Sequence, residues 1–216
     1  MLKVLAVCDD VDSRLYAPGL RASVAVDLLL GCGDLPAYYL DYLVSQLDAP
    51  LYAVHGNHDV PPMLEAAKEL DHCGATWIGG KTAQLRGLLL AGFDGCVRYS
   101  KYGAYESTQS EMQAAVRRMV PWLWLNRFRY GRFLDVLITH APPAGIHDRA
   151  DPAHQGFTAF RWLLETFRPR YHLHGHVHRY DRRTAGTTSL GPTEVVNVFP
   201  YRILEMPLPP RPARAQ

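Results

Sequence analysis

Five short apolar runs in this 216-residue chain end abruptly in aspartate, asparagine or histidine, and this repetition constrains the fold more than any other feature. Their nearly continuous apolar character is typical of strands that are buried on both faces of a sheet. If the strands run parallel, their carboxyl ends share one edge, which is where open α/β folds bind ligands. The sequence therefore predicts that the polar residues meet at that edge. The five runs cover residues 2–8, 26–31, 51–55, 134–139 and 171–174.

The other segments predict an α/β fold. A sixth strand is expected at residues 85–91, and Pro121 is a candidate break in a long helix. Strand–helix alternation followed by β-rich sequence predicts two packed sheets with helices outside. Helical patterns cover residues 37–47, 62–70, 106–126 and 157–167. Short strands, which turns containing Gly or Pro should pair in antiparallel fashion, cover residues 184–188, 194–198 and 202–206.

Composition narrows the class of protein. A formal net charge of +2 gives no general attraction to nucleic acid or membrane. Four cysteines without a CxxC pair argue against a disulfide framework and a zinc knuckle. Neither a signal peptide nor a membrane span is expected, so a cytoplasmic enzyme or binding protein is the simplest class. We expect one domain over residues 1–206 and a disordered proline-rich tail over residues 207–216.

One segment combines arginines with two tryptophans. The arginines favour a solvated helix face over a nucleic-acid patch. Trp122 and Trp124 are expected to pack in the core or to form a lid rather than to contact a membrane. We therefore expect no membrane partner, and nucleic acid is a weak candidate. The arginines are Arg117, Arg118, Arg127, Arg129 and Arg132.

The residue types at the strand ends predict a metal site. Oxygen and imidazole donors without thiolates suit manganese, iron, zinc or cobalt. Two such ions about 3.5–4 Å apart, sharing a carboxylate, form a known arrangement for phosphoryl chemistry. A lone histidine at a strand end is usually structural, which is how we interpret His55, His72 and His172. The repetition across separate segments favours ligands instead.

In order along the chain, these segments resemble the blocks of the calcineurin-like metallophosphoesterase superfamily: D-x-H, G-D, G-N-H-[DE], a later H, and G-H-x-H. The resemblance covers Asp9 to His178 and implies a four-layer α/β sandwich of two facing mixed sheets flanked by helices. The four matching blocks are Gly33-Asp34, Gly56-Asn57-His58-Asp59, His140 and Gly175-His176-Val177-His178.

The same resemblance implies a centre with two divalent ions. Asp34 would bridge them, Asp9 and His178 would hold one, and the remaining ligands would complete the other site. His58 would act as general acid or stabilise developing charge, and Asp59 would orient it. The implied ligands are Asp9, Asp34, Asn57, His140, His176 and His178.

The implied reaction is hydrolysis of a phosphate ester by attack of a metal-bound hydroxide. The substrate would be a small molecule or nucleotide, with a phosphodiester favoured over a monoester. Two other functions stay open. One is a non-catalytic or mononuclear scaffold with the same fold, and the weaker one is a nuclease.

The first block departs from the family pattern, because Val11 stands where its histidine should be. Valine cannot bind a metal, so one site loses a ligand. Asp10 or Asp12 could supply an oxygen instead, water could fill the position, or the site could stay empty. We expect a working centre in which one ion binds more weakly.

Two loops offer further candidates for substrate contact. Arg98 could bind a substrate phosphate. Tyr99, Tyr102 and Tyr105 could stack on a base, although ordinary loop and core positions are equally compatible with these residues. The loop over residues 140–157 could support the metal ligands or form a rim around the substrate. The candidate residues are His147, Asp148, Asp151 and His154.

Overall fold

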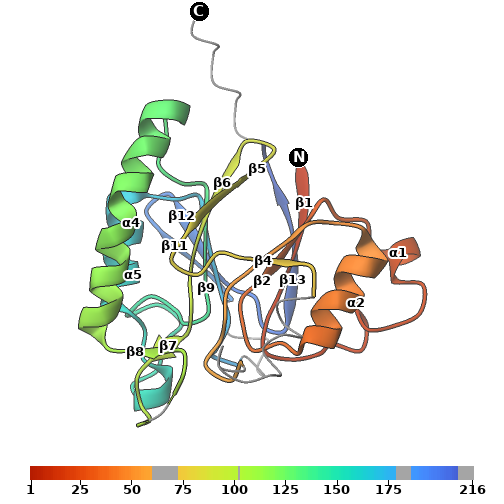
Figure 1. The fold of residues 1–216 in the computed structure, drawn as a ribbon, viewed down its shortest axis with the longest axis horizontal. Helices are drawn as coiled ribbons and strands as arrows, with labels where there is room; N and C mark the ends of the chain where they lie inside the picture. The colour runs from red at the N-terminus through yellow and green to blue at the C-terminus, as the bar shows by residue number, and fades with distance from the viewer. Residues whose placement is uncertain (60–72, 102, 179–185, 209–216) are drawn as a thin grey trace, which may run out of the picture.

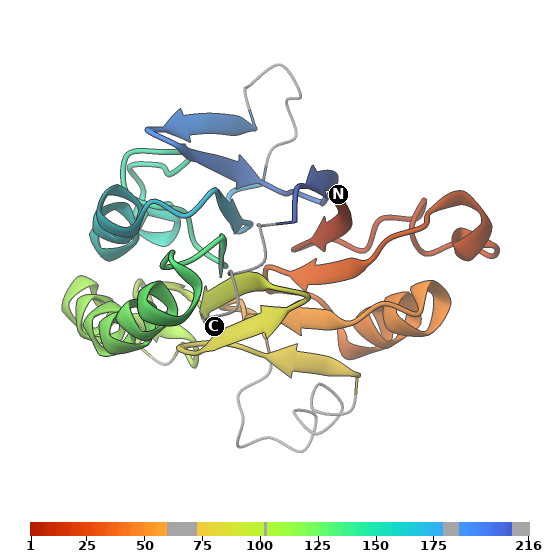
Figure 2. The ribbon, with the colours of Figure 1, turned by 90° about the horizontal axis from the view of Figure 1, so that it is seen from above.

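The computed structural model describes residues 1–59, 73–101, 103–178 and 186–208. Two β-sheets face each other, and helices cover the outer face of each sheet (Figure 1). Seen from above, the two helical layers lie at opposite sides of the paired sheets (Figure 2). The predicted four-layer α/β fold with two mixed sheets is therefore confirmed.

The first sheet has five strands. Their order is β13 (Tyr201–Met206), β1 (Leu2–Val7), β2 (Leu28–Gly31), β3 (Leu51–Ala53) and β4 (Ala75–Trp77). The second sheet has six strands. Their order is β11 (Thr187–Leu190), β12 (Thr193–Asn197), β10 (Tyr171–His174), β9 (Val136–Thr139), β6 (Leu88–Phe93) and β5 (Thr82–Leu85). A small third sheet pairs β7 (Cys96–Val97) with β8 (Glu106–Ser107).

The helices divide between the two outer faces. The first sheet is covered by α1 (Leu20–Ser23) and α2 (Ala37–Leu47). The second is covered by α4 (Gln109–Tyr130) and α5 (Thr158–Phe167). A single turn of 3₁₀ helix, η1 (Pro152–His154), lies in the loop before α5. None of the described helices has both the length and the apolar character needed to cross a bilayer.

Alternation along buried strands explains how one sheet serves two cores. In β1, Val4 and Ala6 face the core between the sheets, whereas Leu5 and Val7 face the core under α2. All four side chains are fully buried, so this strand is apolar throughout, as expected for a strand covered on both faces. The second sheet shares the central core and forms a third core with α4 and α5.

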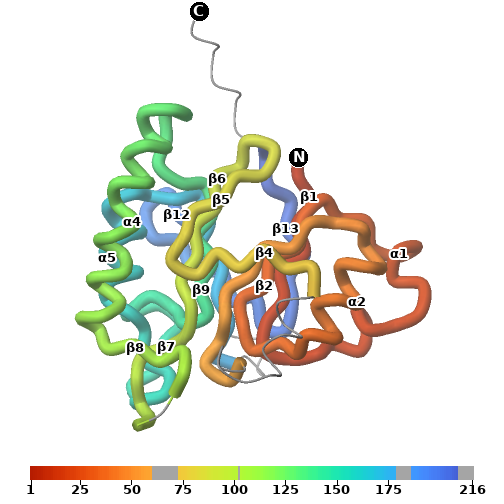
Figure 3. Tube along the Cα trace, in the orientation of Figure 1, coloured from red at the N-terminus to blue at the C-terminus, as the bar shows by residue number. Residues whose placement is uncertain are grey.

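Strand direction brings the predicted polar residues to one edge. In the first sheet, β1, β2, β3 and β4 pair in parallel. In the second, β6, β9, β10 and β12 do the same. β1 runs downward from the N-terminus in Figure 3, so the carboxyl ends of its parallel neighbours lie at the lower edge. Antiparallel strands are confined to sheet margins, where β13, β5 and β11 lie.

Two local predictions need correction. The predicted strand at 85–91 is a hairpin, in which Arg86 and Gly87 form a two-residue turn with φ values of 49° and 91°. The long helix starts three residues later than predicted and continues through Pro121 without a break. Thr108 sets the start, because its hydroxyl accepts from the Glu111 amide while the Glu111 carboxylate accepts from the Thr108 amide.

Trp122 and Trp124 on α4 are 59% and 58% exposed, so of the two placements expected for them, core or lid, packing in the core is wrong. Among the other predicted elements, the helix at 62–70 lies outside the described residues. Residues 209–216 of the predicted tail also lie outside them.

Candidate metal centre

Three of the predicted ligands have a strained backbone conformation, and each lies shortly after the end of a strand. Asp9, Asp34 and His176 have φ values of 63°, 57° and 65°, a region that non-glycine residues seldom occupy. Each strained residue costs on the order of 1–3 kcal/mol and persists only where surrounding structure enforces it, which is common at functional sites. Here the strain turns short side chains toward the shared edge of the two sheets.

Two glycines make room for these side chains. A Cβ atom at Gly56 would collide with the Asp34 carboxylate, and one at Gly175 would collide with the Asp9 carboxylate. Both glycines therefore permit a close approach between carboxylate and backbone that no other residue allows.

The imidazole of His140 lies at the centre of the group and is fully buried. Its Nδ1 is 2.8 Å from the Cys32 carbonyl oxygen, which can only accept, so Nδ1 carries a proton. Its Nε2 lies 2.9 Å from Asn57 Oδ1 and 3.2 Å from Asp34 Oδ2. In the neutral ring, three lone-pair atoms on three different residues would therefore face one another.

Three acceptors that point at one spot need a cation between them, either a proton or a metal ion. Burial alone lowers the pKa of His140, but the charge of Asp34 and the hydrogen bond to it more than offset this and raise the pKa to about 9. In the metal-free protein the cation is thus a proton on Nε2. Burial raises the pKa of Asp34, but the charge and hydrogen bond of His140 together with the amide and charge of His58 outweigh this effect, so the pKa is lowered.

Asp9 joins the same group from the end of β1. Single donor atoms of Asp9, Asp34 and His140 all lie within 4.8 Å of one another. The Asp9 carboxylate also accepts from the His176 amide, at 3.0 and 3.2 Å, which ties the end of β1 to the end of β10. Two carboxylates, an amide oxygen and an imidazole fit a borderline or hard divalent ion better than a soft one.

The two remaining histidine candidates flank this group. His176 Nε2 donates to the Ala153 carbonyl oxygen at 2.6 Å, and burial lowers its pKa to about 4, so Nδ1 keeps its lone pair. Its ring centre lies 4.8 Å from that of His140. His178 Nε2 lies 3.4 Å from Asp9 Oδ1, and the hydrogen bond to Asp9 raises the pKa of His178.

A family model described as calcineurin-like phosphoesterase matches residues 14–180, which is most of the chain. The chain belongs to this family. The match begins beyond Asp9 and Val11, the segment in which the first block departs from the pattern. No match was found among curated proteins.

Solved structures support the phosphoesterase fold. One crystal structure is 21% identical, with 94% of each chain covered and a TM-score of 0.66. The crystal structure of TT1561 of Thermus thermophilus is 16% identical, with a TM-score of 0.63. That similarity covers 91% of this chain and 88% of the other. At these identities the likeness extends to the fold alone.

The segment that replaces the family's histidine does not offer Asp12 as a ligand. Val11 packs, partly buried, against the core under α2. The Asp12 carboxylate is bound by Arg14, whose Nε and Nη2 lie 2.9 and 2.5 Å from its two oxygens. Asp10 is exposed. Of the three outcomes predicted for this position, direct replacement by Asp12 is therefore disfavoured.

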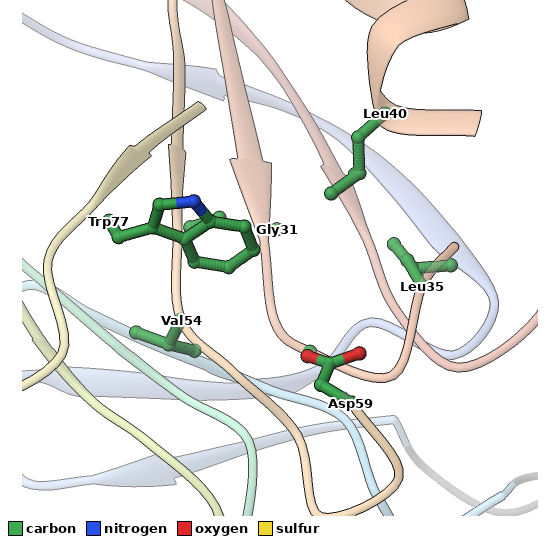
Figure 4. A pocket seen from close by; sticks show the side chains of 8 residues that line it. Gly31, Leu35, Leu40, Val54, Asp59 and Trp77 are labelled. Carbon is green, nitrogen blue, oxygen red and sulfur yellow. The ribbon is translucent and has the colours of Figure 1, made fainter. Parts of the chain in front are cut away.

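Asp59 is placed differently from its predicted role of orienting His58. Its Oδ2 accepts from the amides of Gly56 at 2.8 Å and Asp34 at 3.3 Å. Its buried carboxylate points into a pocket whose walls include Leu35 and Trp77 (Figure 4). Asp59 therefore holds the turns that carry the ligands. His58 is exposed, and its amide donates to Asp34 Oδ1 at 2.7 Å.

Arg98 is also engaged elsewhere than predicted. Its guanidinium donates to the Glu106 carbonyl oxygen in β8 at 3.1 Å and pairs with Glu111 in the first turn of α4 at 2.9 Å. The neighbouring Tyr99 is the residue that reaches the centre, because its hydroxyl accepts from Asn57 Nδ2 at 3.1 Å. This contact turns Asn57 Oδ1 toward His140. The sequence indicated Tyr99 only for base stacking.

Tyr105 and Tyr102 are the other two tyrosines that the sequence offers for stacking on a base. Tyr105 and Trp77 both stack on the ring of His55, with ring centres 4.5 and 3.9 Å away. His55 is thus a strand-end support, as interpreted. Tyr102 lies outside the described residues.

The loop over residues 140–157 lies beside the centre. His147 Nδ1 is 2.9 Å from His174 Nε2, and this partly buried pair supports the end of β10. His154 Nδ1 lies 2.6 Å from Asp151, and its ring centre is 5.3 Å from that of His176. Asp148 accepts from the Gly156 amide and so shapes the loop. His172, which is fully buried, pairs with Thr139 at 2.8 Å and is structural.

Proposed function

We propose that the chain is a metal-dependent phosphoesterase that hydrolyses phosphate esters. The observation that carries this proposal is the convergence of acceptor atoms from His140, Asn57 and Asp34, with Asp9 beside them. Such a convergence is costly in a buried site unless a cation occupies it. Because the chain belongs to the phosphoesterase family, such a cation would have a role in catalysis.

The proposed ligands fall into two sets, an inner set around His140 and an outer set around His178. His140, Asn57 and Asp34, with His176 Nδ1, would hold one divalent ion. Asp9, Asp34 and His178 would hold the second. Manganese, iron, zinc and cobalt suit these donors. A bound ion would lower the pKa of water to near neutrality and neutralise charge on phosphoryl oxygens.

Other residues would prepare the site and handle the proton. Asp59 fixes the amides of Gly56 and Asp34, so the ligand turns are in place before substrate arrives. His58 is exposed and directly follows Asn57 in the chain. Its backbone amide donates to Asp34. From that position its imidazole would protonate the leaving oxygen or stabilise charge that develops on it.

A phosphodiester is the favoured substrate class, with a small molecule or nucleotide as its carrier. Arg98 is tied to Glu106 and Glu111 and so does not supply the extra cationic clamp expected for a dianionic monoester. The Tyr99 hydroxyl, which accepts from Asn57, keeps its own proton to donate to a substrate oxygen.

The test is turnover of model substrates with and without manganese. Purified, metal-stripped protein should hydrolyse bis-nitrophenyl phosphate faster than mono-nitrophenyl phosphate once manganese is added. His58→Ala should lower kcat by roughly a hundredfold or more while leaving metal binding in place. Absence of metal-stimulated turnover of either ester would contradict the proposal.

A second function stays possible because of Val11, namely a scaffold with this fold that does not catalyse. A scaffold should bind its partner equally well after Asp34→Asn or His176→Ala. It should also show no turnover with any metal. The two functions are therefore separated by the same purified variants.

A further inference from the structure

Large aromatic side chains are exposed on one helix. Phe128 is 90% exposed, and Trp122 and Trp124 are 59% and 58% exposed. All three lie on α4, which runs along one side of the molecule with no described segment outside it (Figures 1 and 2). Aromatic residues of this size are usually buried, so several on one helix indicate a surface that is covered in use.

The apolar character of α4 is present on two opposite faces. Its inward face, which includes Met112, Val116 and Leu123, packs in the core with α5. Its outward face carries Pro121, Leu125 and Phe128, spaced three and four residues apart so that they form one stripe. The inward face explains why the helix folds here. The outward stripe is not needed for that packing.

Positive charge borders this stripe. Arg117, Arg118 and Arg129 are all exposed on α4. The only carboxylate in the helix is Glu111, which is held at its first turn by Thr108 and Arg98. The whole chain carries a formal charge of only +2, so these arginines concentrate positive charge on one face.

We propose that this outer face of α4 binds the surface of an anionic lipid bilayer. Basic residues around an apolar stripe that includes Phe and has Trp on both sides are typical of helices that lie in the membrane interface. The arginines would contact acidic headgroups while Phe128 and Trp122 enter the boundary with the acyl chains. This proposal differs from the sequence-based expectation of a solvated helix face and no membrane partner.

Two other occupants fit less well. A second copy of the chain would place the arginines of one α4 against those of the other, and like charges at an interface are repulsive. A nucleic acid would use the arginines, but it offers nothing to the aliphatic centre of the stripe at Pro121 and Leu125. Charge complementarity together with that aliphatic centre favours the lipid surface.

The test is sedimentation of the full chain with vesicles. Binding is expected with vesicles of equal parts phosphatidylcholine and phosphatidylserine, and not with phosphatidylcholine alone. Phe128→Ser should weaken binding roughly tenfold, because it removes the most exposed apolar side chain. Arg118→Gln should weaken it about fivefold, and added salt should weaken it further.

Matched controls lie on the opposite side of the molecule. Tyr38→Ser removes a 58% exposed aromatic residue from α2, and Arg21→Gln removes an exposed arginine from α1. Neither should change vesicle binding. Phe128→Ser should also leave the melting temperature and the hydrolysis of soluble esters unchanged, so this proposal and the proposed function can fail separately.

Three kinds of result would overturn the assignment, and the second of them can arise in two ways. The first is no sedimentation with the anionic vesicles. The second is equal binding to both kinds of vesicle, or an equal loss in Tyr38→Ser. The third is a dimer that forms in solution and is abolished by Phe128→Ser, because this would assign the face to a second copy.

Discussion

The two halves of the proposed metal centre, an inner half around His140 and an outer half around His178, differ in how firmly the protein holds their residues. On the inner side, the His140 side chain is 0% exposed and is fixed by the Cys32 carbonyl oxygen. On the outer side, the His178 side chain is 38% exposed and reaches Asp9 only at 3.4 Å. On that side, Val11 also stands where the family pattern has a histidine.

This difference indicates unequal metal affinities. Ligands locked by buried hydrogen bonds hold their geometry before an ion binds, so little order is lost on binding. His178 is partly exposed, and its ring stacks on Phe199 with ring centres 4.5 Å apart, so it is ordered before an ion binds but less completely than the fully buried His140. We therefore expect one tightly held ion at the inner half and one exchangeable ion at the outer half.

The largest effect should come from Asp34→Asn, because Asp34 belongs to both halves. Metal-stimulated turnover should fall by roughly a hundredfold or more, since even groups that only support a ligand cost 10–100-fold. Steady-state kinetics at saturating manganese measures this. Asp41→Asn, which changes an exposed carboxylate on α2, should have no effect. A wild-type rate in Asp34→Asn would contradict the role of Asp34 as a shared ligand.

The next largest effect separates the halves. His140→Ala should abolish the tight ion, whereas His178→Ala should weaken only the exchangeable ion, by roughly tenfold. Titration calorimetry of metal-stripped protein resolves the two affinities. If both variants lost the same ion, or if His178→Ala had the larger effect, the proposed inequality would be wrong.

The pH dependence of stability provides a third test on the metal-free protein. The pKa of His140 is about 9 in the folded state and 6.5 as a reference. Its stabilising contribution is therefore complete below pH 6.5 and is lost as pH rises through 9. The shift corresponds to about 3 kcal/mol.

Thermal unfolding between those pH values measures this loss. His140→Gln should remove most of the slope, and His178, whose pKa is also raised, should account for the remainder. Manganese should restore the melting temperature at the alkaline end, because the ion replaces the proton. A melting temperature that is flat over this range in the wild-type protein would contradict the charged His140.

The smallest effect should come from Tyr99→Phe. Loss of the hydroxyl removes the contact that turns Asn57 toward His140, and a neutral hydrogen bond contributes about 1 kcal/mol. Affinity for the tight ion should fall about fivefold, with the melting temperature unchanged. Tyr38→Phe on α2 is the control and should behave like the wild type. Equal effects of the two substitutions would leave Tyr99 without a positioning role.

The framework of the site could be predicted from sequence because it depends on local features. Apolar runs that end in polar residues mark parallel strands, and the spacing in GNHD and GHVH marks the candidate ligands. The fold and family followed from these features. The turn at Arg86 and Gly87 did not, since arginine with positive φ lacks the Asn-Gly signature of such turns.

The partners of individual side chains could not be predicted, because they depend on residues that are distant in sequence. Asp59 is adjacent to His58 in the chain, yet its carboxylate accepts from the amides of Gly56 and Asp34. Arg98 has the chemistry of a phosphate ligand, but α4 places Glu111 within its reach. The exposure of Trp122 could not be predicted from the sequence either, because apolar residues on both faces of a helix usually indicate burial.

The most direct test of the account is a crystal structure with anomalous scattering measured at the manganese edge after a manganese soak. We expect a strong peak bounded by His140 Nε2, Asn57 Oδ1 and Asp34 Oδ2, and a weaker peak beside Asp9 and His178. Absence of any peak among these atoms would contradict it, as would a stronger peak on the His178 side.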